Sequence, residues 1–358
     1  MGDAPDPADG RLLDRLRSRL RETRLVAGLP GGWKLGTDPT YLAELIAYWA
    51  DEYDWGAAEA RLLALPWVRA ANGVRAVYQR AEDPAAPTVV LLHGWPDSFL
   101  RYSRVLPLLT DVQVVVPCLP GYPYSDSAAL SREAMAEPIA KMLADLGCER
   151  YVVSGGDIGS GVAEAIARAH PDRVGALHLT DVPLNHLAAM DPSRSAADEQ
   201  AYVASVVKWR AAEGGYIAEQ STKPNTLAVA LGDSPAGLAA WIVEKLRSWS
   251  DCGGDVETVF PRDDLLTWIT LYWVTGAIGT SFGPYAHREP PKAGRVEAPT
   301  AVSVFPRDLL PPPRALAERI FDVRVWEEHA AGGHFAAWEQ PEAFANDLRG
   351  AVALSTIR

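Results

Sequence analysis

The sequence predicts an α/β protein in which a mostly parallel β-sheet carries a helical insertion and a helical N-terminal extension. Three observations support this class. From Gly73 onward, short β-branched runs alternate with helical stretches, which is typical of a parallel sheet covered on both faces. The pattern before Gly73 is helical, and it becomes helical again after Pro183. We therefore expect an N-terminal extension at 1–72, the first part of the sheet domain at 73–183, an insertion at 184–288 and the second part of the sheet domain at 289–358.

Three helices are expected in the N-terminal extension. Apolar residues recur at helical spacing in 12–25, 41–49 and 57–65, and Thr37-Asp38-Pro39 is a start signal for the second helix. None of these stretches carries a cluster of catalytic residue types. We expect the extension to be an accessory layer that packs on the sheet domain.

The strands expected in the sheet domain are short and apolar. They lie at 74–79, 88–92, 112–116, 151–154 and 176–179, with a helix at 132–146, and after the insertion at 300–305 and 323–326, followed by a last helix at 341–354. The insertion between the two parts reads as helical and is rich in Trp and Tyr.

The turn after the strand at 151–154 has the spacing of a nucleophile elbow. Residues Gly155 to Gly159 read Gly-x-Asp-x-Gly, with Asp157 at the position where serine is commoner. A sharp strand-to-helix turn leaves no room for side chains two residues away on either side, which explains the glycines. The following helix N-terminus stabilises negative charge on Asp157. The alternative is an ordinary turn in which the aspartate caps the helix.

A carboxylate nucleophile needs donors for a developing oxyanion. The stretch His93-Gly94-Trp95-Pro96 follows a strand, so the backbone N–H of Trp95 is one expected donor. The N–H of Ile158, next to the nucleophile, is the other. We expect the Trp95–Pro96 peptide bond to be cis, because a cis bond suits such a tight turn. The alternative is an ordinary loop containing glycine and proline.

The nucleophile also needs a base for water and an acid that orients the base. His334 is the candidate base, because of the seven histidines it alone lies in a late glycine-rich loop between a strand and a helix. Asp308, which follows the preceding strand, is the candidate orienting acid, and Asp181, at the end of the strand at 176–179, is the alternative. The order Asp157, Asp308, His334 is nucleophile, acid, base.

Taken together and in order, these motifs resemble the α/β-hydrolase-fold epoxide hydrolases, especially the microsomal and juvenile-hormone branch. The resemblance covers nearly the whole chain, because the stretch around Tyr53-Asp54-Trp55 is similar to the N-terminal domain of that branch. It implies that Asp157 attacks an epoxide carbon and forms an ester with the opened substrate. It also implies that water activated by His334 hydrolyses this ester and releases a vicinal diol. No cofactor and no metal are implied. The motifs are His93–Pro96, Gly155–Gly159, Phe305–Leu309 and Gly332–Ala336.

The resemblance also implies two lid tyrosines that hydrogen-bond the epoxide oxygen. Carried over to this sequence, they are Tyr216 and Tyr285, both in the expected insertion. Tyr124, Tyr202 and Tyr272 are alternatives.

Two departures from the branch change what the resemblance implies. Ile158 stands where Trp is common, which alters the pocket wall. The long apolar anchor of the microsomal enzymes is missing, as in soluble actinobacterial relatives, which include enzymes of enediyne antibiotic biosynthesis that open aryl epoxides. The resemblance therefore suggests a bulky or aryl epoxide and a role in antibiotic biosynthesis.

Composition limits the partners. The net charge of −12 argues against nucleic acid and anionic membranes. No apolar run approaches the roughly 20 residues that a membrane helix needs, and there is no secretory signal. Cys118, Cys148 and Cys252 lack metal spacing and are expected as reduced thiols. We expect a cytoplasmic enzyme whose partner is a small-molecule epoxide, with a homodimer as the default assembly.

Three other functions stay open from the sequence. A haloalkane dehalogenase shares the Asp nucleophile and the His base, but an Asn after the His-Gly turn would favour it, and Trp95 stands there. A non-catalytic ligand-binding protein of the same fold is disfavoured by the intact Asp157, Asp308 and His334. A serine esterase is disfavoured because no Gly-x-Ser-x-Gly follows a suitable strand.

Overall fold

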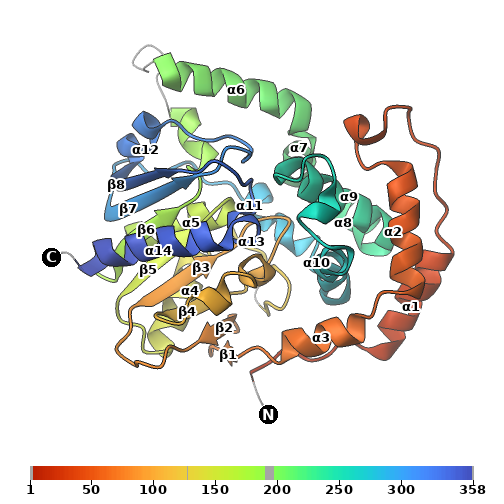
Figure 1. Ribbon diagram of the computed structural model, residues 1–358, viewed down its shortest axis with the longest axis horizontal. Helices are drawn as coiled ribbons and strands as arrows, with labels where there is room; N and C mark the ends of the chain where they lie inside the picture. Colours follow the sequence, from red (N-terminus) through yellow and green to blue (C-terminus); the bar gives the residue numbers. More distant parts are fainter. Residues whose placement is uncertain (1–2, 127, 190–196, 357–358) are drawn as a thin grey trace.

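A computed structural model describes residues 3–126, 128–189 and 197–356. These residues form one eight-stranded sheet with helices packed around it (Figure 1). The strand order is β1-β2-β4-β3-β5-β6-β7-β8, in which β1 and β2 run antiparallel to their neighbours and the remaining pairs are parallel. The predicted α/β class with a mostly parallel sheet is confirmed. The strands are β1 Trp67–Arg69, β2 Arg75–Gln79, β3 Thr88–Leu92, β4 Gln113–Pro117, β5 Tyr151–Gly155, β6 Val174–Leu179, β7 Val296–Val304 and β8 Phe321–Glu328.

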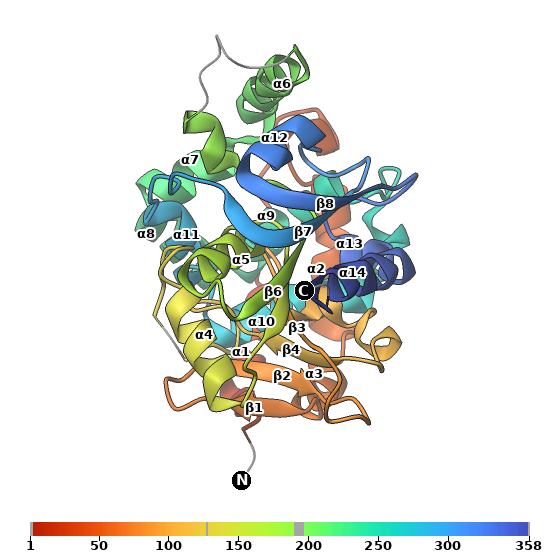
Figure 2. The same ribbon diagram turned by 90° about the vertical axis from the view of Figure 1, so that its left-hand side faces the viewer.

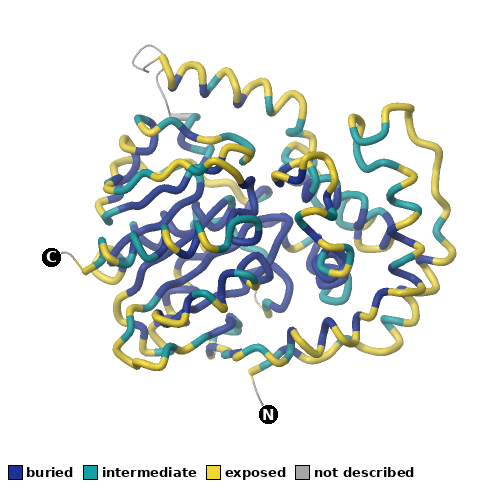
Figure 3. The backbone as a smooth tube through the Cα atoms, in the orientation of Figure 1, coloured by how far each residue is buried: buried dark blue, intermediate teal, exposed yellow. Residues whose placement is uncertain are grey.

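Helices cover both faces of the sheet, which explains why its central strands are apolar throughout. Figure 2 shows α4 (Ala136–Asp145) and α5 (Ile158–Ala169) on one face and α14 (Pro341–Thr356) on the other. Every residue of β4, β5 and β6 is buried as a result. In Figure 3 these strands form the dark centre of the molecule.

The helical insertion lies beside the carboxyl ends of the parallel strands, over the turn that carries Asp157 (Figure 1). Its helices contribute Trp209, Tyr216 and Tyr285 to the same cavity as Asp157. The helices are α6 Ala197–Glu213, α7 Gly215–Thr222, α8 Pro224–Asp233, α9 Pro235–Trp249, α10 Arg262–Thr275 and α11 Gly283–Ala286.

The N-terminal helices pack mainly on the insertion, whereas we expected them to pack on the sheet domain. They are α1 (Gly10–Arg21), α2 (Pro39–Asp51) and α3 (Trp55–Leu63), and α1 and α2 contact α9 while α3 contacts α10. Hydrogen bonds cross the same boundary: Tyr48 donates to Asp263 (2.8 Å), and the buried Tyr53 hydroxyl pairs with Thr267 (2.9 Å). The extension therefore braces the part of the chain that covers the site.

Each predicted helix and strand has a counterpart in the structure, but several bounds differ and some elements were not expected. The short strand β1 lies within the segment predicted to be helical, because three residues are too few to show a period. The helix expected from Arg132 starts at Ala136, since residues 132–135 form turns. Strand β7 starts four residues before the expected Thr300. Helix α12 (Arg314–Ile320), a short helix behind a run of prolines, was not expected.

Among the described residues, no single helix is both long and apolar enough to cross a membrane. Two bent helix pairs, Pro224–Asp233 with Pro235–Trp249 and Arg262–Thr275 with Thr280–Ala286, meet the length and composition test only when joined. The three cysteines, all within the described ranges, are buried and free of disulfide bonds.

Candidate active site

The strand-to-helix turn after β5 holds Asp157 in a backbone conformation that few residues adopt. Its φ is 56° and its ψ is −123°, directly before the first residue of α5. The turn is tight enough that a Cβ on Gly155 would lie 2.3 Å from the carbonyl oxygen of Gly159, and a Cβ on Gly159 would lie 2.1 Å from that of Leu92. Both glycines are therefore required, and the elbow predicted from their spacing is present.

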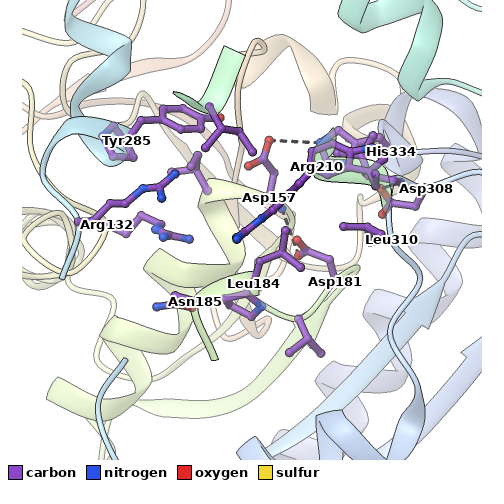
Figure 4. A pocket seen from close by; sticks show the side chains of 18 of the residues that line it. Arg132, Asp157, Asp181, Leu184, Asn185, Arg210, Tyr285, Asp308, Leu310 and His334 are labelled. Atoms are coloured by element: carbon purple, nitrogen blue, oxygen red, sulfur yellow. Dashed lines mark hydrogen bonds and ion pairs between the residues drawn. The ribbon is translucent and has the colours of Figure 1, made fainter. Parts of the chain in front are cut away.

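Two predicted residues, Trp95 and His334, contact the Asp157 carboxylate, and Asp308 contacts His334. Figure 4 shows Asp157, His334 and Asp308. The Oδ2 atom of Asp157 accepts a hydrogen bond from the backbone N–H of Trp95 at 3.2 Å and lies 3.2 Å from Nε2 of His334. On the other side of the imidazole, Nδ1 lies 2.7 Å from Oδ1 of Asp308. The geometry is a carboxylate–imidazole–carboxylate chain that comes from three separate strand ends.

The loop that supplies the Trp95 N–H is fixed by a buried ion pair that the sequence did not suggest. Asp97 accepts from the backbone N–H of Gly94 at 2.8 Å and pairs with Arg101, which in turn donates to the carbonyl oxygen of His334 at 3.1 Å. This pair ties the Trp95 loop to the His334 loop. The Trp95–Pro96 peptide bond is cis, as predicted.

The second predicted oxyanion donor, the N–H of Ile158, lies in the first turn of α5. Among the described hydrogen bonds, it makes none with the Asp157 carboxylate. An N–H in the first turn has no partner within its helix, so it stays available to a negative charge that develops nearby.

The charge on His334 depends on its two carboxylate neighbours. Burial lowers the pKa of His334, but the charge of Asp308 and the hydrogen bond with Asp157 outweigh burial, and the pKa of His334 lies at about 10. The imidazole is therefore protonated at neutral pH. Loss of the Asp157 charge would remove part of the cause and lower the pKa of His334.

Asp181, the alternative orienting acid, has a different contact. It accepts a hydrogen bond from the backbone N–H of Asp157 at 3.1 Å, whereas Nδ1 of His334 faces Asp308. Burial, followed by the charges of Asp308 and Asp157, raises the pKa of Asp181 to about 7. Asp181 thus lies beneath the turn and is partly protonated near neutral pH.

We expect the Asp181→Asn variant to lose less stability than the wild type as pH rises from about 4 to about 7. The folded Asp181 binds its proton more tightly than the unfolded one, so its contribution is complete below about pH 4 and is lost as the pH approaches 7. Over that pH range the unfolding free energy of the wild type should fall by roughly 2 to 4 kcal/mol more than that of the variant. Urea unfolding at several pH values measures this difference.

The matched control for this prediction is Asp14→Asn, which changes an exposed carboxylate of α1. It should leave the pH dependence of the wild type unchanged. Parallel curves for the Asp181→Asn variant and the wild type would contradict the raised pKa of Asp181.

The two tyrosines implied by the resemblance line the same cavity as Asp157 and His334. The ring of Tyr216 stacks on Trp95 with 5.3 Å between ring centroids, and Tyr285 meets Trp95 edge-on at 5.9 Å. Within the described ranges, neither tyrosine hydroxyl has a hydrogen-bond partner. Burial, followed by the charge of Asp157, raises the pKa of both phenols, so both remain protonated donors.

The alternative tyrosines are engaged elsewhere. The hydroxyl of Tyr202 donates to the carbonyl oxygen of Leu310 at 3.2 Å, and that of Tyr272 donates to the carbonyl oxygen of Asp97 at 2.7 Å. Tyr124 lines a separate cavity next to the N-terminal segment.

Three arginines that the sequence gave no reason to select also line the cavity: Arg132, Arg210 and Arg288. They come from distant parts of the chain and belong to no motif, so only the fold brings them together. Across the described residues, no group of three or more His, Cys, Asp or Glu side chains has the geometry of a metal site.

The strand order and the carboxylate-bearing elbow define a hydrolase of the α/β-hydrolase class. Residues 87–212 match the family described as "alpha/beta hydrolase fold", and residues 8–102 match "Epoxide hydrolase N terminus". The chain is 34% identical over 337 residues to a "Putative epoxide hydrolase" of Stigmatella aurantiaca, which covers 88% of this chain and 76% of the relative. The chain belongs to the epoxide hydrolase family.

More distant relatives agree with this membership. "Epoxide hydrolase 1" of Sus scrofa is 29% identical over 386 residues, covering 94% of this chain and 85% of the relative. The crystal structure of juvenile hormone epoxide hydrolase from Bombyx mori superimposes with a TM-score of 0.86 at 27% identity, covering 98% of this chain and 93% of that one. The predicted family, fold and type of enzyme are therefore confirmed.

Proposed function

We propose that this epoxide hydrolase opens a bulky or aryl epoxide to a vicinal diol through an ester formed on Asp157. One observation carries the proposal. A carboxylate stands at the elbow, held between the Trp95 N–H and His334, and two phenols without a protein partner, Tyr216 and Tyr285, line the same cavity. A serine at the elbow would form an ether with an epoxide carbon, which water cannot cleave. A carboxylate forms an ester, which water can cleave.

In the first step, the Asp157 carboxylate attacks one epoxide carbon and the carbon–oxygen bond of the ring breaks. Oδ2 is held by Trp95 and His334, so Oδ1 is the oxygen that is free to attack. The epoxide oxygen leaves as an alkoxide and takes a proton from the phenols of Tyr216 and Tyr285. The products of this step are an alkyl ester of Asp157, a hydroxyl on the neighbouring carbon and a phenolate.

Formation of the ester converts His334 from an acid into a base. The ester carries no charge, so one cause of the raised pKa of His334 disappears, and the imidazolium loses its proton. That proton restores the phenol. The neutral imidazole, still held by Asp308, then accepts a proton from water.

In the second step, the resulting hydroxide attacks the ester carbonyl of Asp157. The oxyanion that forms is stabilised by the backbone N–H groups of Trp95 and Ile158. Loss of one such donor raises the activation free energy by about 3 to 4 kcal/mol. The tetrahedral intermediate collapses and expels the diol alkoxide, which takes the remaining proton of the new carboxyl. The resting state, with a charged His334 and a charged Asp157, returns.

The lining of the cavity supports a bulky or aryl substrate. Aromatic rings from Trp209, Tyr202, Tyr216 and Tyr285 face the same space, and such rings favour a flat apolar group. A role in antibiotic biosynthesis, a cytoplasmic location and a homodimer stay predictions from the sequence.

The dehalogenase alternative is less well supported by the site. A halide needs a free donor near the nucleophile, but the indole N–H of Trp95 already donates to the Ser281 hydroxyl at 3.2 Å. The unpaired phenols fit an epoxide oxygen, which becomes an alkoxide and needs a proton.

The test of the proposal is turnover of styrene oxide by the wild type and by the Tyr216→Phe/Tyr285→Phe double variant. We expect the wild type to form styrene glycol, with one enantiomer consumed faster on a chiral column. The double variant keeps the rings but loses both donors, so kcat should fall by roughly 100-fold or more. Chromatography of the diol measures both.

Tyr272→Phe is the control, because that phenol donates to a backbone carbonyl outside the cavity. It should slow the reaction far less than the double variant. Release of bromide from 1-bromobutane without diol formation from styrene oxide would favour the dehalogenase and overturn the proposal.

A further inference from the structure

Three arginines surround the space above Asp157, and the proposed mechanism uses none of them. Arg132 lies in the turn before α4, Arg210 in α6 and Arg288 just after α11, and all three line the cavity that contains Asp157. In Figure 4 the side chains of Arg132 and Arg210 approach from opposite sides, with both guanidinium groups directed toward the middle of the view.

The guanidinium groups lack protein partners. In the described part of the chain, none of the three forms a hydrogen bond or ion pair with another side chain. They also lie close enough to repel one another: partial burial, followed by the charges of Arg132 and Arg210, lowers the pKa of Arg288. A protein with a net charge of −12 thus gathers three unneutralised cations at one opening.

The acidic groups of the cavity do not neutralise this cluster. Asp157 and Asp308 both pair with His334. The Glu289 carboxylate accepts a hydrogen bond from the hydroxyl of Ser131 at 2.9 Å. Asp181 lies below the turn, where it accepts the Asp157 N–H. Cations that repel one another and form no ion pair with a carboxylate of the cavity are suited to bind an anion.

We propose that the substrate carries an oxyanion, a carboxylate or a phosphoryl group, at a distance from the epoxide ring, and that Arg132, Arg210 and Arg288 bind it. The inference rests on the proposed function and narrows its substrate class. Arginine suits this role because its planar fork matches the paired oxygens of either group. The anion has to lie away from Asp157, whose own charge repels it, so it faces the three arginines while the epoxide ring meets the two tyrosines.

The wild-type protein tests this inference with two substrates of the same shape. One is styrene oxide with a para carboxylate, and the other is styrene oxide with a para carboxamide, which is neutral. We expect kcat/KM for the acid to exceed that for the amide by about tenfold or more at low salt. The ratio should fall toward one at high salt, because ions screen exposed charges. Equal kcat/KM values at low salt, or a preference for the amide, would overturn the inference.

The variants Arg210→Gln and Arg288→Gln, singly and combined, locate the effect. We expect the double variant to reduce the acid-to-amide ratio of kcat/KM by about tenfold. Lys208→Gln is the matched control for Arg210→Gln, since it removes one positive charge from the same helix at a residue that does not line the cavity. The ratio should stay at the wild-type value in this control. An equal change of the ratio in the control and in the double variant would overturn the assignment to these arginines.

Two further results keep the two proposals distinguishable. Hydrolysis of both substrates at equal rates would contradict the anion site but would agree with the proposed function. Failure to hydrolyse either epoxide would contradict the proposed function itself. A para phosphonate substrate separates the two anions: a preference for it over the carboxylate supports a phosphoryl group, and the opposite preference supports a carboxylate.

Discussion

We expect replacement of Asp157 by alanine to abolish diol formation from styrene oxide. The variant keeps the Trp95 donor, His334 and both tyrosines, but no atom remains that can form the ester. We expect kcat to fall by on the order of 10⁴-fold or more, as for the loss of other covalent nucleophiles. Chromatographic detection of the glycol after long incubation at high enzyme concentration measures the residual rate.

The control for this prediction is a test that the Asp157→Ala variant keeps the wild-type fold. Asp157 has an unfavourable positive φ, so its substitution could alter the turn, and a thermal unfolding curve close to that of the wild type shows that the turn survives. A folded Asp157→Ala protein that kept even a tenth of the wild-type rate would show that the carboxylate is not the nucleophile.

We expect the His334→Gln variant to accumulate the ester on Asp157. In the proposed mechanism the first step needs Asp157 and the tyrosines, whereas the second needs a base, and glutamine cannot accept a proton from water. We therefore expect a covalent adduct in close to one copy per enzyme molecule, with a mass increase equal to that of the epoxide. Intact-protein mass spectrometry followed by peptide mapping should place the adduct on the peptide that contains Asp157.

The double variant Asp157→Ala/His334→Gln is the matched control, because it lacks both the base and the proposed attacking group. It should show no adduct under the same conditions. An adduct of equal yield in this double variant would mean that the epoxide alkylates another residue.

The residues of the candidate active site could be predicted from the sequence, because each of them lies in a short motif that is recognisable by itself. The strand at 151–155, the glycines around Asp157 and the loop at Trp95 each have a short-range signal, and the structure places them where that signal indicates. The choice of His334 and Asp308 also depended on short loops at strand ends. The structure places them in contact with each other and with Asp157.

The features that were missed arise from contacts between distant parts of the chain. Arg132, Arg210 and Arg288 lie in three separate elements, and no spacing in the sequence links them. The packing of the N-terminal helices on α9 depends on which faces remain exposed after the sheet domain has formed. The raised pKa of Asp181 likewise requires burial beside two other carboxylates, which a linear pattern does not reveal.

The central claim is that the oxygen added to the epoxide comes from Asp157 and not directly from water. A single turnover in H₂¹⁸O, with enzyme in excess over styrene oxide, tests it most directly. We predict that the glycol contains no ¹⁸O and that the peptide containing Asp157 gains it, because water replaces the carboxylate oxygen that leaves with the product. A glycol that carries ¹⁸O after one turnover, together with an unlabelled Asp157 peptide, would contradict the mechanism.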